Sequence, residues 1–336
     1  MTDDGVDQEN GTCGLGIIDS LSAGYRLLTR RPYLMGLPIL LDLLLLALPR
    51  LSIAPLYQAL AGWYVQSADM EGLAPEMASM LGDIGTAVET FGEHSNLLGM
   101  LANNSLLHVP SLMAAMGGVT GQSVITLDDP WRVLGLALVF SLLSVLIGVT
   151  YLELLVRSLP IGNGPKRGSA AEFVGSVLRH SVRVLLFVVT VALLLLLIYL
   201  PLSIALALVS MVSVGLSSIL GLTAGFMTML LFVYLYFAVP ALIMDDLGVR
   251  AAIVQSMQLV RSHFLPTLGF VLLTNLIGLG LGLIFVQLAD NSLWGALVAI
   301  PANAFIGTGL AIALLLFYRT RVLLMAETVA MFDRRM

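Results

Sequence analysis

Three polar side chains lie deep inside long apolar runs of the sequence: Asp42, Asn275 and Asn303. At the rise of an α-helix, each lies ~12–15 Å from an end of its run, so we expect all three at a similar depth in a membrane. A carboxylate at that depth can bind a proton or a cation, and two carboxamides can act as neutral ligands. The sequence therefore predicts a candidate midplane polar site formed by these three residues.

The same residues also have a structural interpretation. Polar side chains in membrane helices often hydrogen-bond to a neighbouring helix and hold the two together. Arg50 follows Asp42 on the same predicted helix face and is expected to compensate part of its charge. We favour this packing role over ligand binding, because one aspartate among the apolar runs is too few for a proton relay.

The elements that position these residues are six apolar runs, each long enough to cross a bilayer as a helix. They are residues 33–55, 131–156, 184–210, 215–243, 266–289 and 295–318. Of the 336 residues, 58% are hydrophobic and only 11% are charged, and the net charge is −5. This composition excludes a soluble enzyme and a nucleic-acid binder. The sequence predicts an all-α polytopic membrane protein.

Positive charges lie almost entirely on one side of these runs. Of 16 Lys and Arg residues, only Arg50 and Arg132 fall on the other side. Because basic loops stay in the cytoplasm, we expect both chain ends to be cytoplasmic. The expected domains are an acidic disordered tail (1–15), a membrane domain (16–325) and a cytoplasmic C-terminal tail (326–336). The acidic start lacks the basic region of a signal peptide, so the first run is expected to stay as an anchor.

Two amphipathic stretches share one spacing at a displacement of 232 residues. The stripes are Ile17, Leu21, Tyr25 and Leu28 in the first, and Val249, Ile253, Met257 and Val260 in the second. A weaker third stripe follows Ser169. Pro32 and Pro266 mark the turn from each strong stripe into the next run. We expect three repeats, each an interfacial helix and a two-span hairpin, although short loops between spans can look amphipathic without a repeat.

The segments 17–32 and 238–273, the latter containing "VPALIMDDLGVRAAIVQSMQLVRSHFLPTLGFVLL", carry a resemblance. The pattern resembles a group of bacterial polytopic membrane proteins that includes the membrane domain of some glycerophosphoryl diester phosphodiesterases. The resemblance covers about a third of the chain and implies a fold in a bacterial cytoplasmic membrane. It implies no activity or site residues, because the catalytic domain of those enzymes has no counterpart here.

Residues 67–129 form one long stretch between the first two spans. The spacing of apolar residues from Met77 to Phe91 predicts a helix, and Asp129-Pro130 is typical of a helix start. We expect an extracytoplasmic helical insert that caps the outer ends of the spans. A docking surface for a partner, or a lid, is the alternative.

Small residues recur every fourth position in the last three runs, as in Gly221 and Gly225, Gly278 and Gly282, and Gly309 and Ala313. This spacing favours close helix packing, either within the chain or in self-association. Near the inner surface, Glu153 is expected to pair with Arg157 one turn later. No metal site, cofactor motif or catalytic motif is found. The sequence predicts a non-enzymatic structural or accessory protein, with a small-solute or ion-coupled transporter using Asp42 as the alternative.

Overall fold

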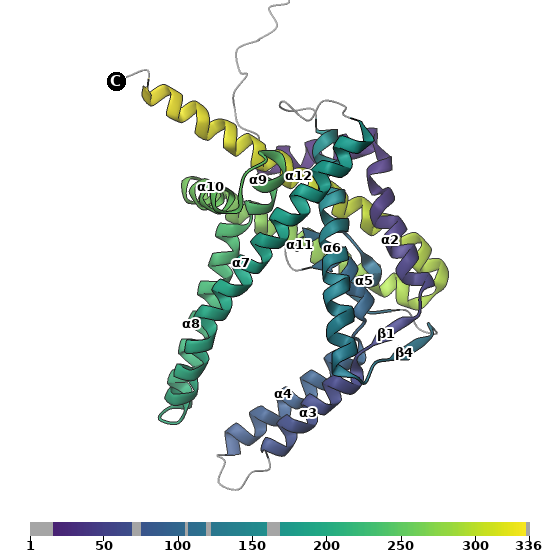
Figure 1. Ribbon diagram of the computed structural model, residues 1–336, viewed down its shortest axis with the longest axis vertical. Helices are drawn as coiled ribbons and strands as arrows, with labels where there is room; N and C mark the ends of the chain where they lie inside the picture. Colours follow the sequence, from purple (N-terminus) through teal and green to yellow (C-terminus); the bar gives the residue numbers. More distant parts are fainter. Residues whose placement is uncertain (1–15, 69–74, 105–106, 119–121, 160–168, 334–336) are drawn as a thin grey trace, which may run out of the picture.

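A computed structural model describes residues 16–68, 75–104, 107–118, 122–159 and 169–333, and helices dominate it (Figure 1). The helices, with the 3-10 helices η1 and η2, are α1 (Ile17–Arg30), η1 (Pro32–Met35), α2 (Gly36–Ala47), α3 (Ala54–Ala68), α4 (Pro75–Glu93), η2 (Leu97–Leu101), α5 (Leu112–Met116), α6 (Pro130–Ser158), α7 (Ala170–Ser210), α8 (Val214–Leu235), α9 (Ala238–Met244), α10 (Val249–Ser262), α11 (Phe264–Asn291) and α12 (Leu293–Asp333). The fold is all-α and of the polytopic membrane type.

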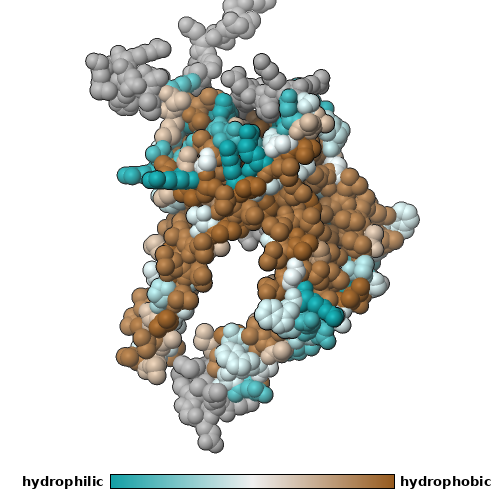
Figure 2. Space-filling model, in the orientation of Figure 1, coloured by the Kyte–Doolittle hydropathy of each residue, from teal (hydrophilic) through white to brown (hydrophobic). Residues whose placement is uncertain are grey.

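Five helical segments are long and apolar enough to cross a membrane. They are Pro130–Ser158, Ala170–Ser210, Val214–Met244, Phe264–Asn291 and Leu293–Glu327. Their outer faces are lined with exposed leucines such as Leu197, Leu222 and Leu283, and Figure 2 shows how much of the surface is apolar. Side chains of this kind suit contact with hydrocarbon rather than water. The protein is therefore a multi-pass membrane protein.

The first predicted span is shorter than expected. Helix α2 ends at Ala47, and Leu48 has extended backbone, with φ −80° and ψ 151°. Pro49 explains the end, because proline disfavours helical geometry in the residue before it. Together η1 and α2 form one apolar helical segment, Pro32–Ala47, which is shorter than the ~20 residues of a full spanning helix. The expected run 33–55 is thus wrong beyond Ala47 as a single spanning helix.

Two short sheets follow the end of α2. Strand β1 (Arg50–Ser52) pairs in parallel with β4 (Val124–Thr126), with Arg50 opposite Val124. Strands β2 (Asn103–Asn104) and β3 (Leu107–His108) form an antiparallel pair. The β1–β4 pair brings the end of α2 next to the start of α6, which begins at Pro130 with the Asp129 side chain accepting from the Trp131 amide, as the sequence predicts.

The two strong amphipathic stripes form helices of equal length. Both α1 and α10 have 14 residues and follow a glycine with extended backbone, Gly16 and Gly248. Three buried positions correspond at the displacement of 232 residues. They are Ser20, Gly24 and Leu28 in α1, and Ala252, Ser256 and Val260 in α10. The two helices therefore share a register of buried positions, whereas Met257 of the predicted second stripe is exposed.

The third stripe has a different outcome. Residues after Ser169 continue without a break into α7, which runs from Ala170 to Ser210 as one helix. Pro32 and Pro266 separate the strong stripes from the following helices, whereas no glycine or proline follows Gly175 before Pro201. Without a breaker the helix simply propagates. The three-unit repeat remains a prediction.

The insert predicted as a cap divides into two parts. Helices α3 and α4 pack on each other and project away from the bundle (Figure 1). In contrast, α5 lies against α2, α11 and α12, and its residues Leu112 and Met113 are fully buried. The apolar side chains of α5 are therefore buried inside the bundle instead of covering it.

Candidate functional site

Asp42 is fully buried on α2, and all its described partners belong to the start of α5. The Ser111 hydroxyl donates to Oδ1 at 2.5 Å. The backbone amide of Leu112 donates to Oδ2 at 3.0 Å, and that of Met113 donates to Oδ1 at 3.1 Å. Both carboxylate oxygens therefore accept hydrogen bonds from one short helix.

This arrangement follows from the needs of a helix end. The first amides of a helix lack partners within the helix and carry partial positive charge, so a carboxylate stabilises them. Ser111 is the N-cap of α5 and accepts from the Ala114 amide. Gly117 ends the helix with φ 71°, and a Cβ atom there would lie 2.0 Å from the His94 carbonyl oxygen. Helix α5 is thus fixed at both ends, and Asp42 holds its beginning.

The other two predicted site residues lie elsewhere. Asn275 is exposed on α11, and its Nδ2 donates to the Val271 carbonyl oxygen at 2.8 Å within the same helix. Asn303 is half-buried on α12. Within the described ranges, no hydrogen bond joins Asp42 to Asn275 or Asn303. The structure does not bring the three together as one hydrogen-bonded cluster.

Arg50 also departs from expectation. Its Nε donates to the Ser95 carbonyl oxygen at 3.1 Å, and its Nη2 donates to the carbonyl oxygen of Glu93, the last residue of α4. A cation at that end satisfies carbonyls that have no partner within the helix. Arg50 therefore supports the outward hairpin, and the positive environment of Asp42 comes from the α5 amides instead.

A larger polar cluster lies at the corner between α9 and α10 (Asp245–Gly248). Asp245 Oδ2 accepts from the Tyr318 hydroxyl at 2.5 Å and from Gln255 Nε2 at 3.0 Å. Its Oδ1 accepts from Arg319 Nη1 at 3.1 Å. Asp245 thereby joins the corner to α10 and α12.

The adjacent Asp246 joins the same corner to α7. Its carboxylate lies 3.1 Å from His180 Nε2 and 3.4 Å from Arg179 Nη2, and it accepts a hydrogen bond from Arg183 Nη1. Asp246 has φ 53°, a left-handed backbone that Asp tolerates better than most residues. Consecutive aspartates consequently point toward different helices.

His180 and Glu153 extend this cluster into the protein. Both side chains are almost fully buried, with 5% and 3% of their surfaces exposed. His180 Nδ1 lies 3.3 Å from Glu153 Oε2, an ion-pair distance. Glu153 also lies 3.2 Å from Arg157 Nε, as predicted, and accepts from the Ser176 hydroxyl at 2.8 Å. One imidazole thus lies between carboxylates from α6 and from the corner.

At the Asp246 end of this cluster, neighbouring cations determine the pKa of the carboxyl group. Desolvation acts to raise the pKa of Asp246, but the hydrogen bonds from His180 and Arg183 and the charges of Arg179 and Arg183 outweigh it and lower that pKa. The carboxylate is therefore stabilised in its charged form. This cluster works as an electrostatic link between α6, α7, α10 and α12, and the described residues contain no group of His, Cys, Asp or Glu able to hold a metal ion.

Sequence reasoning missed the corner cluster as a unit. It identified the Glu153–Arg157 pair, but not the connection from Glu153 through His180 to Asp246. The available signal was two aspartates directly after an apolar helix, on the side where basic residues gather. Such carboxylates need cationic partners, and the nearest candidates in the sequence pattern were the basic residues of α7.

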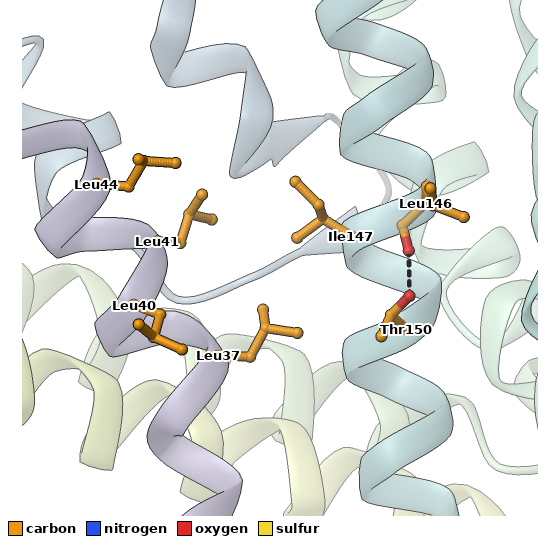
Figure 3. Close-up of a pocket in the computed structure, with 7 residues that line it drawn as sticks. All are labelled: Leu37, Leu40, Leu41, Leu44, Leu146, Ile147 and Thr150. Atoms are coloured by element: carbon orange, nitrogen blue, oxygen red, sulfur yellow. Dashed lines mark hydrogen bonds between the residues drawn. The ribbon is translucent and has the colours of Figure 1, made fainter. Parts of the chain in front are cut away.

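An apolar groove of about 420 Å³ lies between α2 and α6 (Figure 3). It is lined by Leu37, Leu40, Leu41, Leu44, Leu146, Ile147 and Thr150. Asp42 contacts α5 and does not line this groove. Comparison with family models, with curated proteins and with solved structures gives no match for the chain.

Proposed function

We propose that this protein is a non-enzymatic structural or accessory component of a bacterial cytoplasmic membrane. The observation that carries the proposal is the use of Asp42. Both of its oxygens accept hydrogen bonds from α5. Because the carboxylate is used to hold α5 against α2, the main candidate group for binding a coupled ion is already occupied. This use favours the accessory role over the transporter alternative.

The proposed contact surface is the α3–α4 hairpin. It projects from the bundle (Figure 1) and exposes large apolar side chains, of which Trp63 is 60% exposed. The exposed members are Leu60, Trp63, Val65, Met80 and Phe91. The stretch 51–131 contains no Lys or Arg and several acidic residues. Aromatic and apolar side chains on a projecting acidic element suit a protein partner with an apolar, basic surface.

The orientation is part of the proposal. Helices α3 and α4 project toward the same side of the bundle as the free end of the α7–α8 pair, opposite the end of α12 (Figure 1). Arg26, Arg30 and Arg31 lie in or next to α1, and Arg319 and Arg321 lie near the end of α12. Since basic segments stay in the cytoplasm, we place α1 and the chain ends inside and the hairpin outside. This orientation requires the chain to cross a sixth time, through the apolar segment Pro32–Ala47 and the extended residues after it.

The proposal is tested by affinity purification in mild detergent with quantitative mass spectrometry. The test variant is Trp63→Gln combined with Met80→Gln, since both side chains are largely exposed. Its control is Ile18→Gln, since Ile18 is an apolar residue on α1 that is 73% exposed. We expect a defined partner that the control retains and the hairpin variant loses. The proposal would be contradicted if the unchanged protein, the hairpin variant and the Ile18→Gln control co-purified with the same proteins.

A second measurement separates the accessory role from transport. In the transporter hypothesis, Asp42→Asn abolishes solute or ion flux in reconstituted vesicles while the fold persists. In our proposal, Asp42→Asn destabilises the fold by weakening the contact with α5. The unchanged protein and the variant then show no flux. Flux that depends on Asp42 in a protein of unchanged stability would favour the transporter.

A further inference from the structure

The groove between α2 and α6 presents hydrocarbon throughout. Leucine and isoleucine side chains line it from both helices (Figure 3). Thr150 is the one lining residue with a polar side chain, and its hydroxyl donates to the Leu146 carbonyl oxygen at 2.7 Å. The volume of about 420 Å³ falls in the range of small-molecule sites, ~300–1,000 Å³. The chemistry of the lining fits an alkyl chain and excludes a polar solute.

One end of the same two helices carries positive charge. Arg31 Nη1 donates to the Ser158 carbonyl oxygen at 3.0 Å, which ties the chain just before α2 to the last residue of α6. Arg30 is exposed, and no described carboxylate lies within ion-pair distance of either arginine. Tyr33, next to them in η1, is 66% exposed, as is typical of tyrosine at a membrane interface.

The apolar and basic parts are continuous. On α6, Thr150, Leu154 and Ser158 lie on successive turns of one face, so the groove leads toward the carbonyl that Arg31 binds. On the other wall, Tyr33 precedes Leu37 by about one turn. A basic interface followed by a hydrocarbon groove has the same order of polarity as a phospholipid, from phosphate to acyl chain.

We propose that this groove binds an acyl chain of one anionic phospholipid, whose headgroup phosphate is held by Arg30 and Arg31. Arginine suits the headgroup because its planar donors match phosphate oxygens. The absence of a described carboxylate beside the two arginines favours an anionic headgroup over a zwitterionic one, whose cation would meet like charge. The inference goes beyond the accessory role and requires only that the bundle lies in a bilayer.

The test is native mass spectrometry of the purified protein in micelles that contain equal amounts of phosphatidylglycerol and phosphatidylcholine. We expect the unchanged protein to retain phosphatidylglycerol in preference to phosphatidylcholine. Leu40→Trp fills the groove from an exposed position and should reduce retention of both lipids. Leu43→Trp lies on the same helix outside the groove lining and should behave like the unchanged protein.

The headgroup arm uses Arg30→Gln alone and with Arg31→Gln. We expect the preference for phosphatidylglycerol to fall roughly tenfold in the double variant, the factor that one charge-assisted hydrogen bond represents. The single variant Arg30→Gln keeps the contact between Arg31 and Ser158. A smaller loss of lipid preference in this variant would therefore reflect the removed charge and not a disturbed fold. Equal retention in Leu40→Trp and Leu43→Trp, or an unchanged lipid preference in the double variant, would overturn the proposal. Neither result depends on a protein partner.

Discussion

At the scale of single residues, the charged groups of this membrane protein act as connectors. Asp42 binds the start of α5, Arg50 binds the end of α4, and Asp246 binds the basic face of α7. Each of these three groups has partners from another element, and the cost of an unpaired charge away from water explains why. The polar residues are therefore best understood through the elements that they join.

Asp42 gives the clearest residue-scale prediction. Replacement by Ala leaves the Ser111 hydroxyl and two amides without an acceptor, at about 1–3 kcal/mol for each buried group. We expect Asp42→Ala to lower the free energy of unfolding by about 3 kcal/mol or more, and Asp42→Asn to cost less because one oxygen remains. Chemical denaturation in micelles measures both. Equal stability of Asp42→Ala and the unchanged protein would contradict the assigned role.

Asp246 predicts a dependence on acid. Its pKa is lowered in the folded state, so its contribution to stability is present above the ordinary Asp pKa of about 3.9 and is lost as the pH falls through the lower folded pKa. We expect melting temperatures to drop in this acid range. Asp246→Asn, which tolerates the left-handed backbone, should flatten that part of the profile. An unchanged acid limb in the variant would show that other carboxyls cause it.

At the scale of elements, the sequence contained most of the fold. Hydropathy predicted the long helices, and the stripes predicted α1 and α10 with their register. It failed at the end of α2, where Pro49 interrupts a run that stays apolar, and at α5, whose burial depends on contacts with α2, α11 and α12. Local patterns determine helices, whereas long-range contacts decide which short segments are buried.

The candidate site was predictable only in part, for the same reason. Asp42 was recognised as a costly buried charge, but its partners lie about 70 residues later, in a stretch that reads as an outward loop. Asn275 was grouped with Asp42 because the sequence gives only the depth of a residue in its helix. In the structure, Asn275 lies on an exposed face of α11. Hydropathy gives depth in a membrane but not the partner across a helix interface.

Small residues matter where two helices touch. A Cβ atom at Gly309 would lie 2.2 Å from the Tyr25 ring, and one at Gly24 would lie 2.7 Å from the Gly309 carbonyl oxygen. We therefore expect Gly309→Ala to destabilise the α1–α12 contact by about 1–3 kcal/mol. Gly221→Ala is the matched control, since a Cβ atom there meets nothing within 4 Å. Thermal denaturation of both variants in micelles compares them, and equal effects would contradict the packing.

The α8 glycines add a consequence for self-association. A Cβ atom at Gly221 or at Gly225 would meet nothing within 4 Å in the single chain, so these two glycines leave room for a second copy of the helix. If copies of the chain associate through it, Gly221→Leu should shift the protein toward monomers while leaving the stability of the monomer unchanged. Sedimentation in density-matched detergent measures the shift.

At the scale of the whole molecule, the protein is a bundle with an apolar girdle, with hydrophilic residues gathered at one end and over part of the α3–α4 hairpin (Figure 2). The corner cluster ties helices together at one end, and the α3–α4 hairpin projects at the other (Figure 1). Between them, apolar helices expose leucines over most of their length. This distribution requires a bilayer around the girdle and places the two ends in different aqueous compartments.

The most direct test of this account is the sidedness of the two ends in intact cells. Single cysteines are introduced at Ser22 of α1 and at Gln66 of α3, which are both exposed, after Cys13→Ser removes the only native thiol. A membrane-impermeant maleimide should label the Gln66→Cys protein in intact cells, and the Ser22→Cys protein only after permeabilisation. Labelling of both proteins, or of Ser22→Cys alone, in intact cells would contradict the account.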